Sequence, residues 1–386
     1  MEPLQVPDPE RLAAVQRLCD TATPYERNEA LEKLFVSAMR EIVAWHRERN
    51  PFYAKLLEQT ELDPERLDTL ESLRSIPPIH ANFFKRHVTL SIPREKVAEH
   101  LTSSGTSGQK TQMFFDDWSI RSARRMVRFI YEYYGFVRPE TKVNYLLLAY
   151  EPEAGSKVGT TNTNLFLTSF APANEIFFAL RLSGGGHEFD KFGTVATLVR
   201  YAEAELPVRI SGFPSFMYFT LLRMEEEKLR LRLHPDSLVL FGGGWKGYAE
   251  RQIPKEELYA MIHDRLGIDP ARIRDAYGSV EHSIPYIECP HHHLHLPIWS
   301  RLVVRDVKTL APLDYGQEGF LHFLTPYLTS VPAHSVMMGD IGVLHPASEC
   351  GCGAKTPFFE VIGRAGVSRN KSCAVTASEL LKKRGV

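Results

Sequence analysis

The stretch "PVRISGFPSFMYFTLLRMEEEKLRLRLHPDSLVLFGGG", residues 207–244, decides the expected fold. Its start, "PVRISGF" at 207–213, predicts a strand, and "SFMYFTLLRMEEEKLRLRL" at 215–233 predicts a helix. A second strand follows in "SLVLFGGG" at 237–244 and ends in a glycine turn. A strand, a helix and another strand in succession are typical of a parallel sheet with helical crossovers.

The same alternation continues on both sides of this stretch. Strands are predicted in "KVNYLLLAY" at 142–150 and in "IRDAYGSVE" at 273–281, and helices in "FGTVATLVRYAEAEL" at 192–206 and "KEELYAMIHDRLG" at 255–267. Residues 8–75 are expected to be mostly helical. After Glu281, short β-like runs such as "SRLVVRDV" and "GFLHFLTP" replace the helical periodicity. We therefore expect an α/β fold with mostly parallel, doubly wound sheets and a small, mostly antiparallel β sub-structure.

Composition limits the classes of protein to which the chain can belong. It has 386 residues, 44% hydrophobic and 24% charged, which is ordinary for a soluble globular protein. A net charge of −1 gives no electrostatic reason for a nucleic-acid or membrane-surface partner. The first residues lack the basic and apolar regions of a signal peptide, and no run approaches the ~18 apolar residues of a spanning helix. We expect a cytoplasmic protein whose thiols stay reduced.

One short segment is rich in hydroxyls. "TSSGTSGQKT" at 102–111 holds six hydroxyl side chains, two glycines, one lysine and no acid. A solvated loop is one interpretation, since Ser, Thr and Gly are common in loops. The other is an anion site, where glycines let backbone N–H groups approach phosphate oxygens closely. Lys110 does not follow a glycine directly, so the segment is not a Walker-type P-loop.

Four more motifs follow this loop in a recognisable order. They are "FGGGW" at 241–245, "YGSVE" at 277–281, "GDIG" at 339–342 and "GRAG" at 363–366. The set resembles the adenylate-forming (acyl-AMP) superfamily, and within it the acyl-protein synthetase (LuxE-type) branch, close to the phenylacetate–CoA ligase-like enzymes. The resemblance implies an adenylate-forming (AMP-binding) domain over 1–362, with the β-rich sub-structure at about 282–362. A short tail at 363–386 would stand where relatives carry a C-terminal lid domain, which is largely absent.

The resemblance also implies roles for particular residues. The hydroxyl-rich loop would close over the ATP phosphates, with Lys110 neutralising charge on the leaving pyrophosphate. Gly105 and Gly108 would permit close approach, and hydroxyl and backbone donors would come from Thr102, Ser103, Ser104, Thr106 and Ser107. Tyr277 and Gly278 would face adenine, which lies against Gly242, Gly243 and Gly244. Glu281 would hold Mg²⁺, Asp340 would accept hydrogen bonds from the ribose, and Arg364 would contact ribose or phosphate. Phe213 and Phe216 are expected to line the acyl pocket, although aromatics at this spacing also suit a plain core.

Cys373 is the expected nucleophile of the second step. Acyl-protein synthetases, which this chain resembles, transfer the acyl group to a cysteine near their own C-terminus, and Cys373 stands in that place. Arg369 and Lys371 would lower the pKa of its thiol and favour the thiolate. An ordinary exposed or half-buried thiol is the alternative.

Cysteines and histidines gather in two further segments. "ECPHHHLHLP" at 288–297 and "ECGCG" at 349–353 together offer soft and borderline ligands that suit tetrahedral zinc. We expect Cys289, His295, Cys350 and Cys352 to bind a structural Zn²⁺, with the spacing found in some phenylacetate–CoA ligase-like relatives. His291, His292 and His293 remain competitors, and a histidine-rich surface strand beside two turn cysteines is the alternative.

The resulting hypothesis is an ATP-dependent acyl-protein synthetase. It would convert a fatty or other carboxylic acid and ATP into acyl-AMP, with Mg²⁺, and then into a cysteine thioester. An acyl-accepting reductase or a carrier protein is the expected partner. The alternatives are an acyl- or aryl-CoA ligase, transfer to a carrier-protein thiol, and a zinc-stabilised nucleotide-binding protein without turnover.

Overall fold

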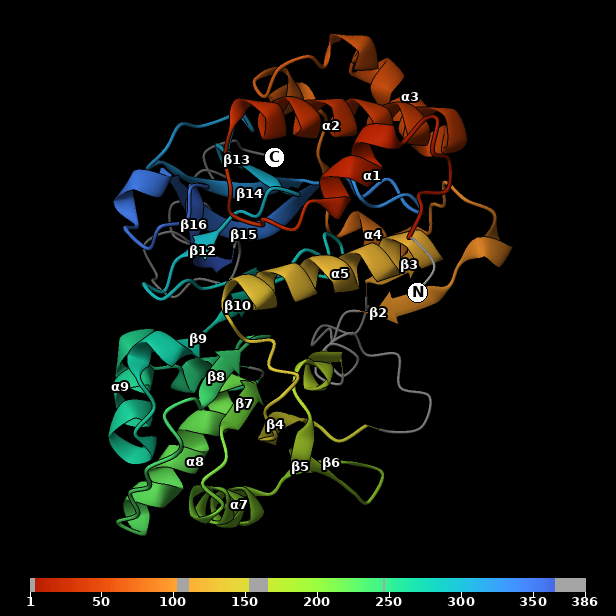
Figure 1. Cartoon of the computed structure of the whole chain (residues 1–386). Coiled ribbons are helices and arrows are strands. Elements are labelled where there is room, and N and C mark those ends of the chain that lie inside the picture. Colours follow the sequence, from red (N-terminus) through yellow and green to blue (C-terminus); the bar gives the residue numbers. More distant parts are fainter. Residues whose placement is uncertain (1–3, 103–110, 153–165, 246, 365–386) are drawn as a thin grey trace, which may run out of the picture.

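The computed structural model describes residues 4–102, 111–152, 166–245 and 247–364 (Figure 1). Two six-stranded sheets organise these residues. The predicted Ser103, Ser104, Gly105, Thr106, Ser107, Gly108, Lys110 and Cys373 lie outside the described residues.

The first sheet is the parallel one that the sequence predicted. Its order is β6-β5-β4-β7-β8-β9, and every neighbouring pair is parallel except β5 with β6. The strands are β4 Val143–Tyr150, β5 Ala173–Ser183, β6 Gly186–Phe189, β7 Val208–Gly212, β8 Leu238–Phe241 and β9 Ile273–Arg274. The helices of this half are α7 Lys191–Glu203, α8 Pro214–Glu226 and α9 Lys255–Leu266 (Figure 1). Their apolar faces share one core with the sheet, so the expected α/β architecture is confirmed.

The helix in the opening stretch is shorter than its sequence predicted. A helix was expected over 215–233, but α8 ends at Glu226 and Lys228 takes a left-handed φ of 54°. Beyond it, the N–H of Leu231 donates to the carbonyl of Arg265 and that of Leu233 to Leu266, at 2.8 and 2.9 Å. These carbonyls belong to the last turn of α9 and have no partner within their own helix. Tertiary hydrogen bonds therefore replace the last turns of the expected helix.

The strand expected over 273–281 is also divided. Ile273–Arg274 forms β9 of the parallel sheet, whereas Ala276–Tyr277 forms β10 and pairs with β11, Tyr286–Ile287. At the division the N–H of Asp275 donates to Glu288 Oε2 at 2.8 Å, and the Asp275 carboxylate accepts from the next N–H. The chain therefore leaves the parallel sheet at Asp275 and begins a separate hairpin.

The second sheet is antiparallel along its main path. Its order is β12-β16-β15-β14-β13, and β1 pairs parallel with β15 at one side. The strands are β1 Ile79–His80, β12 Leu294–His295, β13 Arg301–Arg305, β14 Glu318–Leu324, β15 Ser335–His345 and β16 Phe358–Arg364. One strand thus comes from the N-terminal part of the chain, far from the β-rich segment that the sequence pattern indicated.

Helices from the first third of the chain pack with the antiparallel sheet. They are α1 Ala13–Asp20, α2 Glu29–Arg49, α3 Pro51–Gln59, α4 Phe83–Arg86 and α5 Asp117–Tyr133. Buried indole N–H groups join the two layers: Trp45 donates to the carbonyl of Thr329 at 2.9 Å and Trp299 to that of Leu18 at 3.0 Å. Figure 1 shows α5 lying across the middle of the molecule, between the two sheets. This arrangement forms a second, larger core.

Short elements complete the described chain. A hairpin of β2 Glu99–Thr102 and β3 Gln112–Phe115 brackets the hydroxyl-rich loop, because Thr102 pairs with Gln112. Seven 3-10 turns are described, at Pro64–Arg66, Ser72–Ser75, Arg94–Lys96, Thr168–Phe170, Ala249–Arg251, Pro270–Arg272 and Ala347–Glu349. In the part of the chain that the structure describes, we find no helix of the length and apolarity that a lipid bilayer requires.

Candidate active site and metal centre

Three residues of the predicted nucleotide site meet between the β10–β11 hairpin and the antiparallel sheet. Tyr277 ends β10, and its hydroxyl donates to Asp340 Oδ2 at 2.8 Å. Asp340 lies on β15 directly opposite Arg364 on β16, and Arg364 Nε lies 3.6 Å from Asp340 Oδ1. We call Tyr277, Asp340 and Arg364 the nucleotide-side group.

The chemistry of this group is set by burial. Burial, and then the nearby Asp340 carboxylate, raises the pKa of Tyr277 well above its ordinary value. Its hydroxyl therefore keeps its proton and serves as a donor to the carboxylate. The Tyr277 ring packs against Phe323 and Phe359, with centroids 5.8 and 5.6 Å away, which fixes its position. The Arg364 side chain is 64% exposed, so this group is open on the arginine side.

The glycine turn lies at the end of the parallel sheet. Gly242 follows β8, and its N–H donates to the carbonyl of Gly212, the last residue of β7, at 3.1 Å. Gly243 and Gly244 have φ of 79° and 66°, a region that disfavours other residues. A Cβ built on Gly242 would come 3.9 Å from the Ala276 carbonyl oxygen, so the turn lies beside the start of β10. The turn and Tyr277 are thus brought together, as the motif order implied.

Glu281 is tied to the end of the hydroxyl-rich loop. The Thr111 hydroxyl donates to Glu281 Oε1 at 2.6 Å, and both side chains are buried. Thr111 was part of the quoted loop but was not singled out from the sequence. The only feature of the sequence that could have indicated a role for Thr111 was its position directly after Lys110. The contact joins the "YGSVE" motif to the segment that was expected to bind phosphates.

The base of the β10–β11 hairpin is held by a buried acid that sequence reasoning missed. The Glu288 side chain is 2% exposed and accepts hydrogen bonds from Lys255 Nζ at 2.6 Å and the Tyr259 hydroxyl at 3.0 Å. It also accepts the Asp275 N–H described above. Both partner side chains come from α9, so this acid ties the hairpin to the parallel half of the molecule.

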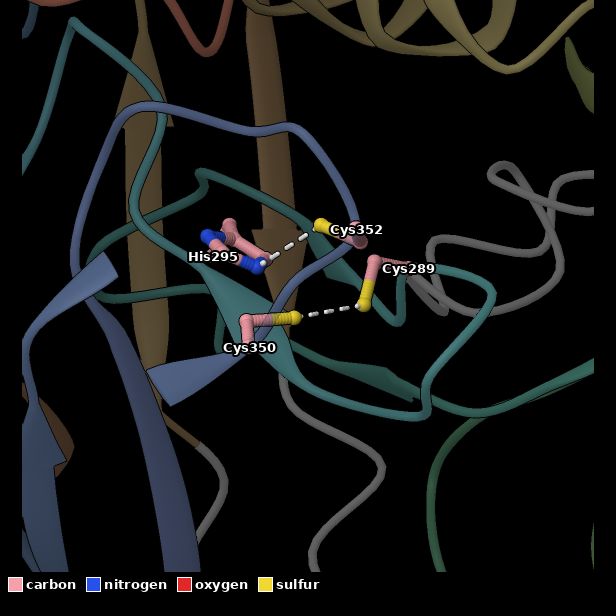
Figure 2. A group of neighbouring side chains, drawn as sticks. All are labelled: Cys289, His295, Cys350 and Cys352. Carbon is pink, nitrogen blue, oxygen red and sulfur yellow. Dashed lines mark hydrogen bonds between the residues drawn. The ribbon is translucent and has the colours of Figure 1, made fainter. Parts of the chain in front are cut away.

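The four predicted metal ligands form one compact cluster (Figure 2). Their ligand atoms all lie within 4.8 Å of one another, with Cys289 Sγ 3.5 Å from Cys350 Sγ and Cys352 Sγ 3.3 Å from His295 Nε2. Cys289, His295 and Cys350 are buried, and Cys352 is half-buried. We call these four residues the Cys/His cluster.

Local turns and one strand pair position the Cys/His cluster. Cys289 begins a tight turn in which its N–H donates to the His293 carbonyl at 2.9 Å. His295 lies on β12 opposite Phe358 of β16. Between the other two cysteines, Gly351 takes a φ of 73°, which lets Cys350 and Cys352 face the same point. Segments about sixty residues apart in sequence therefore converge at one place.

The donor set fits a tetrahedral metal ion. Metal–ligand distances of ~2.0–2.3 Å place neighbouring ligand atoms of a tetrahedral zinc site about 3.3–3.8 Å apart, and the Cys289–Cys350 and His295–Cys352 distances lie in that range. His295 Nδ1 lies 2.7 Å from the Thr356 carbonyl, which fixes the proton there and leaves Nε2 free to bind a cation.

Of the three competing histidines, two lie beside oxygen atoms and one contacts a sulfur of the Cys/His cluster. His291 Nδ1 lies 2.6 Å from the Cys350 carbonyl, and His292 Nδ1 lies 3.5 Å from Glu288 Oε2. His293 is the nearest competitor, with Nδ1 3.1 Å from Cys350 Sγ. Its ring stacks on Phe358, with centroids 4.2 Å apart.

Comparisons with known proteins agree with the motif order. A family model described as "Acyl-protein synthetase, LuxE" matches residues 8–382. A long-chain-fatty-acid–luciferin-component ligase of Vibrio harveyi is 24% identical, over 98% of this chain and 97% of that protein. A phenylacetate–coenzyme A ligase of Thermus thermophilus is 35% identical, over 85% of this chain and 68% of that protein.

A solved structure has the same fold. It is a 2-hydroxyisobutyryl-CoA ligase in an open conformation with 2-HIB-AMP and CoA, which superposes with a TM-score of 0.65 at 16% identity. The match covers 91% of this chain and 80% of that one. At this identity the likeness concerns the fold alone.

Proposed function

The chain belongs to the LuxE family of acyl-protein synthetases, and on that premise we propose that it activates a long-chain fatty acid with ATP and passes the acyl group to a cysteine thiol. The observation that carries the proposal is the Tyr277–Asp340 hydrogen bond beside the glycine turn. It joins residues of two motifs, from the β10–β11 hairpin and the antiparallel sheet, in a family whose relatives include long-chain-fatty-acid ligases.

The first step is adenylation. A carboxylate oxygen of the acid attacks the α-phosphorus of ATP, the bond from that phosphorus to the bridging oxygen breaks, and pyrophosphate leaves. Asp340 accepts hydrogen bonds from the ribose hydroxyls, and the Tyr277 hydroxyl keeps this carboxylate in position. The adenine lies along Gly242–Gly244, where the absence of side chains leaves the backbone accessible.

We assign the binding of the ATP phosphates to the hydroxyl-rich loop. Donors of residues 102–108 and Lys110 stabilise the charge that develops on the leaving pyrophosphate, which is the largest electrostatic demand of the step. Mg²⁺ neutralises phosphate oxygens when bound, and Glu281 is the carboxylate that we assign to it. The Thr111 hydroxyl orients that carboxylate.

The second step is transfer to Cys373. The thiolate attacks the acyl carbonyl carbon, the bond from that carbon to the AMP phosphate oxygen breaks, and AMP leaves with the electron pair. Cys373 lies nine residues after Arg364 in the sequence, and nine extended residues span up to about 30 Å. Arg369 and Lys371 favour the thiolate form. An acyl-accepting reductase or carrier protein would take the group from this thioester.

The Cys/His cluster is assigned to a structural Zn²⁺. All four tetrahedral positions are filled by protein atoms, which leaves none for a reacting water or substrate. The cluster joins the turn at Cys289 to the Cys350–Cys352 segment, so its contribution is to the stability of the fold.

Mass spectrometry after incubation with ATP and tetradecanoate tests the transfer step. Wild-type protein should gain one hydroxylamine-labile acyl group, and Cys373→Ser should lose the label while keeping tetradecanoate-dependent pyrophosphate exchange. A label that persists in Cys373→Ser would overturn transfer to this thiol.

The 35% identity to a phenylacetate–coenzyme A ligase favours a second candidate, an acyl- or aryl-CoA ligase. In that case the acyl group would leave as a free CoA thioester. Product analysis with and without CoA separates the two: a CoA thioester with no protein label favours the second candidate.

A further inference from the structure

Three arginines line a small cavity at the amino edge of the parallel sheet. The cavity has a volume of about 110 Å³ and lies against the first residues of β4, β7 and β8. Arg138, Arg209 and Arg272 are on its wall, and Asp236 is the only acid among the described residues there. The volume is well below the ~300–1,000 Å³ of sites for drug-sized ligands, so it suits a small ion.

This edge of the sheet is opposite to the one that carries the glycine turn. Because β4, β7, β8 and β9 are parallel, their amino ends lie at one edge and their carboxyl ends at the other. The glycine turn follows Phe241 at the carboxyl end of β8, whereas the cavity lies against Leu238 at its amino end. At ~3.3 Å per residue, β8 separates the two by roughly 10 Å. An occupant of the cavity would therefore be distinct from the nucleotide that we assign to the turn.

Backbone carbonyl groups hold two of the guanidinium groups in place. Arg209 Nη2 donates to the Phe136 carbonyl at 2.5 Å. Arg272 Nη2 donates to the Asp236 carbonyl at 2.6 Å, and its Nε donates to the Ser237 carbonyl at 2.8 Å. These neutral acceptors orient the planar guanidinium groups but do not cancel their positive charges.

Carboxylates compensate little of the positive charge at this cavity. The Asp236 carboxylate lies 3.9 Å from Arg272 Nη2, and its side chain is 66% exposed, so this ion pair is weak. Among the described residues, no carboxylate forms an ion pair with Arg138 or Arg209. Burial lowers the pKa of Arg209, and the Arg138 charge acts in the same direction, so the two guanidinium groups repel each other. Both stay charged, because arginine keeps its proton in proteins.

We propose that this cavity binds a phosphate-sized oxyanion, either free inorganic phosphate or the phosphoryl end of a phosphomonoester. A guanidinium group presents a fork of N–H donors that matches the oxygens of a phosphate. Thr141 lies on the same wall and offers a hydroxyl donor. The inference does not depend on the proposed function, since it uses no residue that we assign to adenylation or acyl transfer.

The bound anion would link two parts of the fold. Arg138 lies in the connection that follows α5, a helix that packs in the core of the antiparallel half. Arg209 lies on β7, and Arg272 directly precedes β9 of the parallel sheet. An anion between them would replace repulsion between like charges by attraction on both sides. Since a ligand of the folded state stabilises it, occupancy should raise the thermal stability of the protein.

Thermal unfolding in sodium phosphate, with sodium chloride at equal ionic strength as reference, tests this site. The Tm of wild-type protein should rise with phosphate concentration and then saturate. Arg138→Gln should raise the Kd for phosphate at least about tenfold, because it removes a hydrogen-bond donor that carries charge. In chloride alone, Arg138→Gln should be at least as stable as wild type, since it removes a repelling charge.

Two further variants separate this site from other effects of phosphate. General salt effects act on every variant alike, so Arg94→Gln, at an exposed arginine elsewhere, should keep the wild-type response. Lys110→Ala should keep it as well, because the cavity is separate from the hydroxyl-rich loop. An equal phosphate response in wild type and Arg138→Gln, or its loss in Lys110→Ala, would overturn the proposal.

Glycerol 3-phosphate distinguishes the two sources of the anion. A saturable rise in Tm with this ester that is lost in Arg138→Gln would identify a phosphomonoester as the occupant. A rise with inorganic phosphate only would identify the free anion. The absence of a saturable rise with either compound in wild-type protein would overturn the site. None of these outcomes depends on ATP–pyrophosphate exchange, so they are independent of the proposed function.

Discussion

The Cys/His cluster and the nucleotide-side group are built in opposite ways. The cluster brings four side chains together within 4.8 Å, three of them buried, and its donors face one another. The residues of the nucleotide-side group come from the β10–β11 hairpin and from the antiparallel sheet, and the Arg364 side chain is 64% exposed. A closed set of protein donors suits a resident ion that stabilises the fold, whereas an open set suits ligands that enter and leave. Variants in the two regions should therefore change different properties.

The largest expected effect lies on the phosphate side of the open region. Lys110→Ala should lower kcat for ATP–pyrophosphate exchange about 10²- to 10³-fold, because a donor placed where transition-state charge develops contributes roughly 3–4 kcal/mol. Lys96→Ala, which removes an exposed lysine from the same part of the sequence, is the matched control. Equal rates in both variants would remove Lys110 from the mechanism.

The closed region should respond through stability. Cys350→Ser removes one of four ligands, so bound zinc should fall below one per chain and Tm should drop by at least about 5 °C, since metal-binding energy is folding energy at such sites. Metal analysis of untagged protein and a thermal scan measure both quantities.

Variants of His295 and His293 test which of the two histidines is the metal ligand. His295→Ala should lose the metal, whereas His293→Ala should keep it, although His293 Nδ1 lies only 3.1 Å from Cys350 Sγ. Loss of zinc from His293→Ala alone would show that the ligand set is wrong.

Asp340→Ala should change nucleotide binding more than stability. Hydrogen bonds to a charged group contribute ~1.5–3 kcal/mol, so the KM for ATP should rise about 10- to 100-fold. Zinc content should remain that of wild type, and Tm should fall by less than in Cys350→Ser, because only the Tyr277 hydroxyl loses its acceptor. A fall in Tm as large as that of Cys350→Ser would break the division between the two regions.

The smallest effect is expected at the Tyr277 hydroxyl. Tyr277→Phe keeps the ring and removes the donor to Asp340, which should raise the KM for ATP about 2- to 10-fold. Tyr315→Phe, at a side chain that is 47% exposed, controls for loss of a hydroxyl elsewhere. A wild-type KM in Tyr277→Phe would show that Asp340 does not need this donor.

Local patterns in the sequence were enough to predict much of the fold. The β4, β7 and β8 strands were predictable because short apolar runs alternate with helical periodicity. The Cys/His cluster was predictable because its ligands occupy two short motifs, each folded by a local turn. Family resemblance supplied the identities of Tyr277, Asp340 and Arg364, which no local pattern distinguishes.

Contacts between distant segments could not be predicted. No periodicity in the sequence predicts that β1 pairs with β15. None predicts that the Thr111 hydroxyl donates a hydrogen bond to Glu281, 170 positions away. The break at Asp275 depends on Glu288, whose burial follows from the packing of α9. Tertiary hydrogen bonds and packing decided these features, and local propensity did not encode them.

The measurement that tests the central claim most directly is ATP–pyrophosphate exchange with and without tetradecanoate. Adenylation at the nucleotide-side group predicts exchange that depends on tetradecanoate in wild-type protein and is much weaker in Asp340→Ala at subsaturating ATP. Exchange at the same rate with and without tetradecanoate would contradict adenylation of the fatty acid. Equally fast exchange in wild-type protein and Asp340→Ala at subsaturating ATP would contradict the role of Asp340.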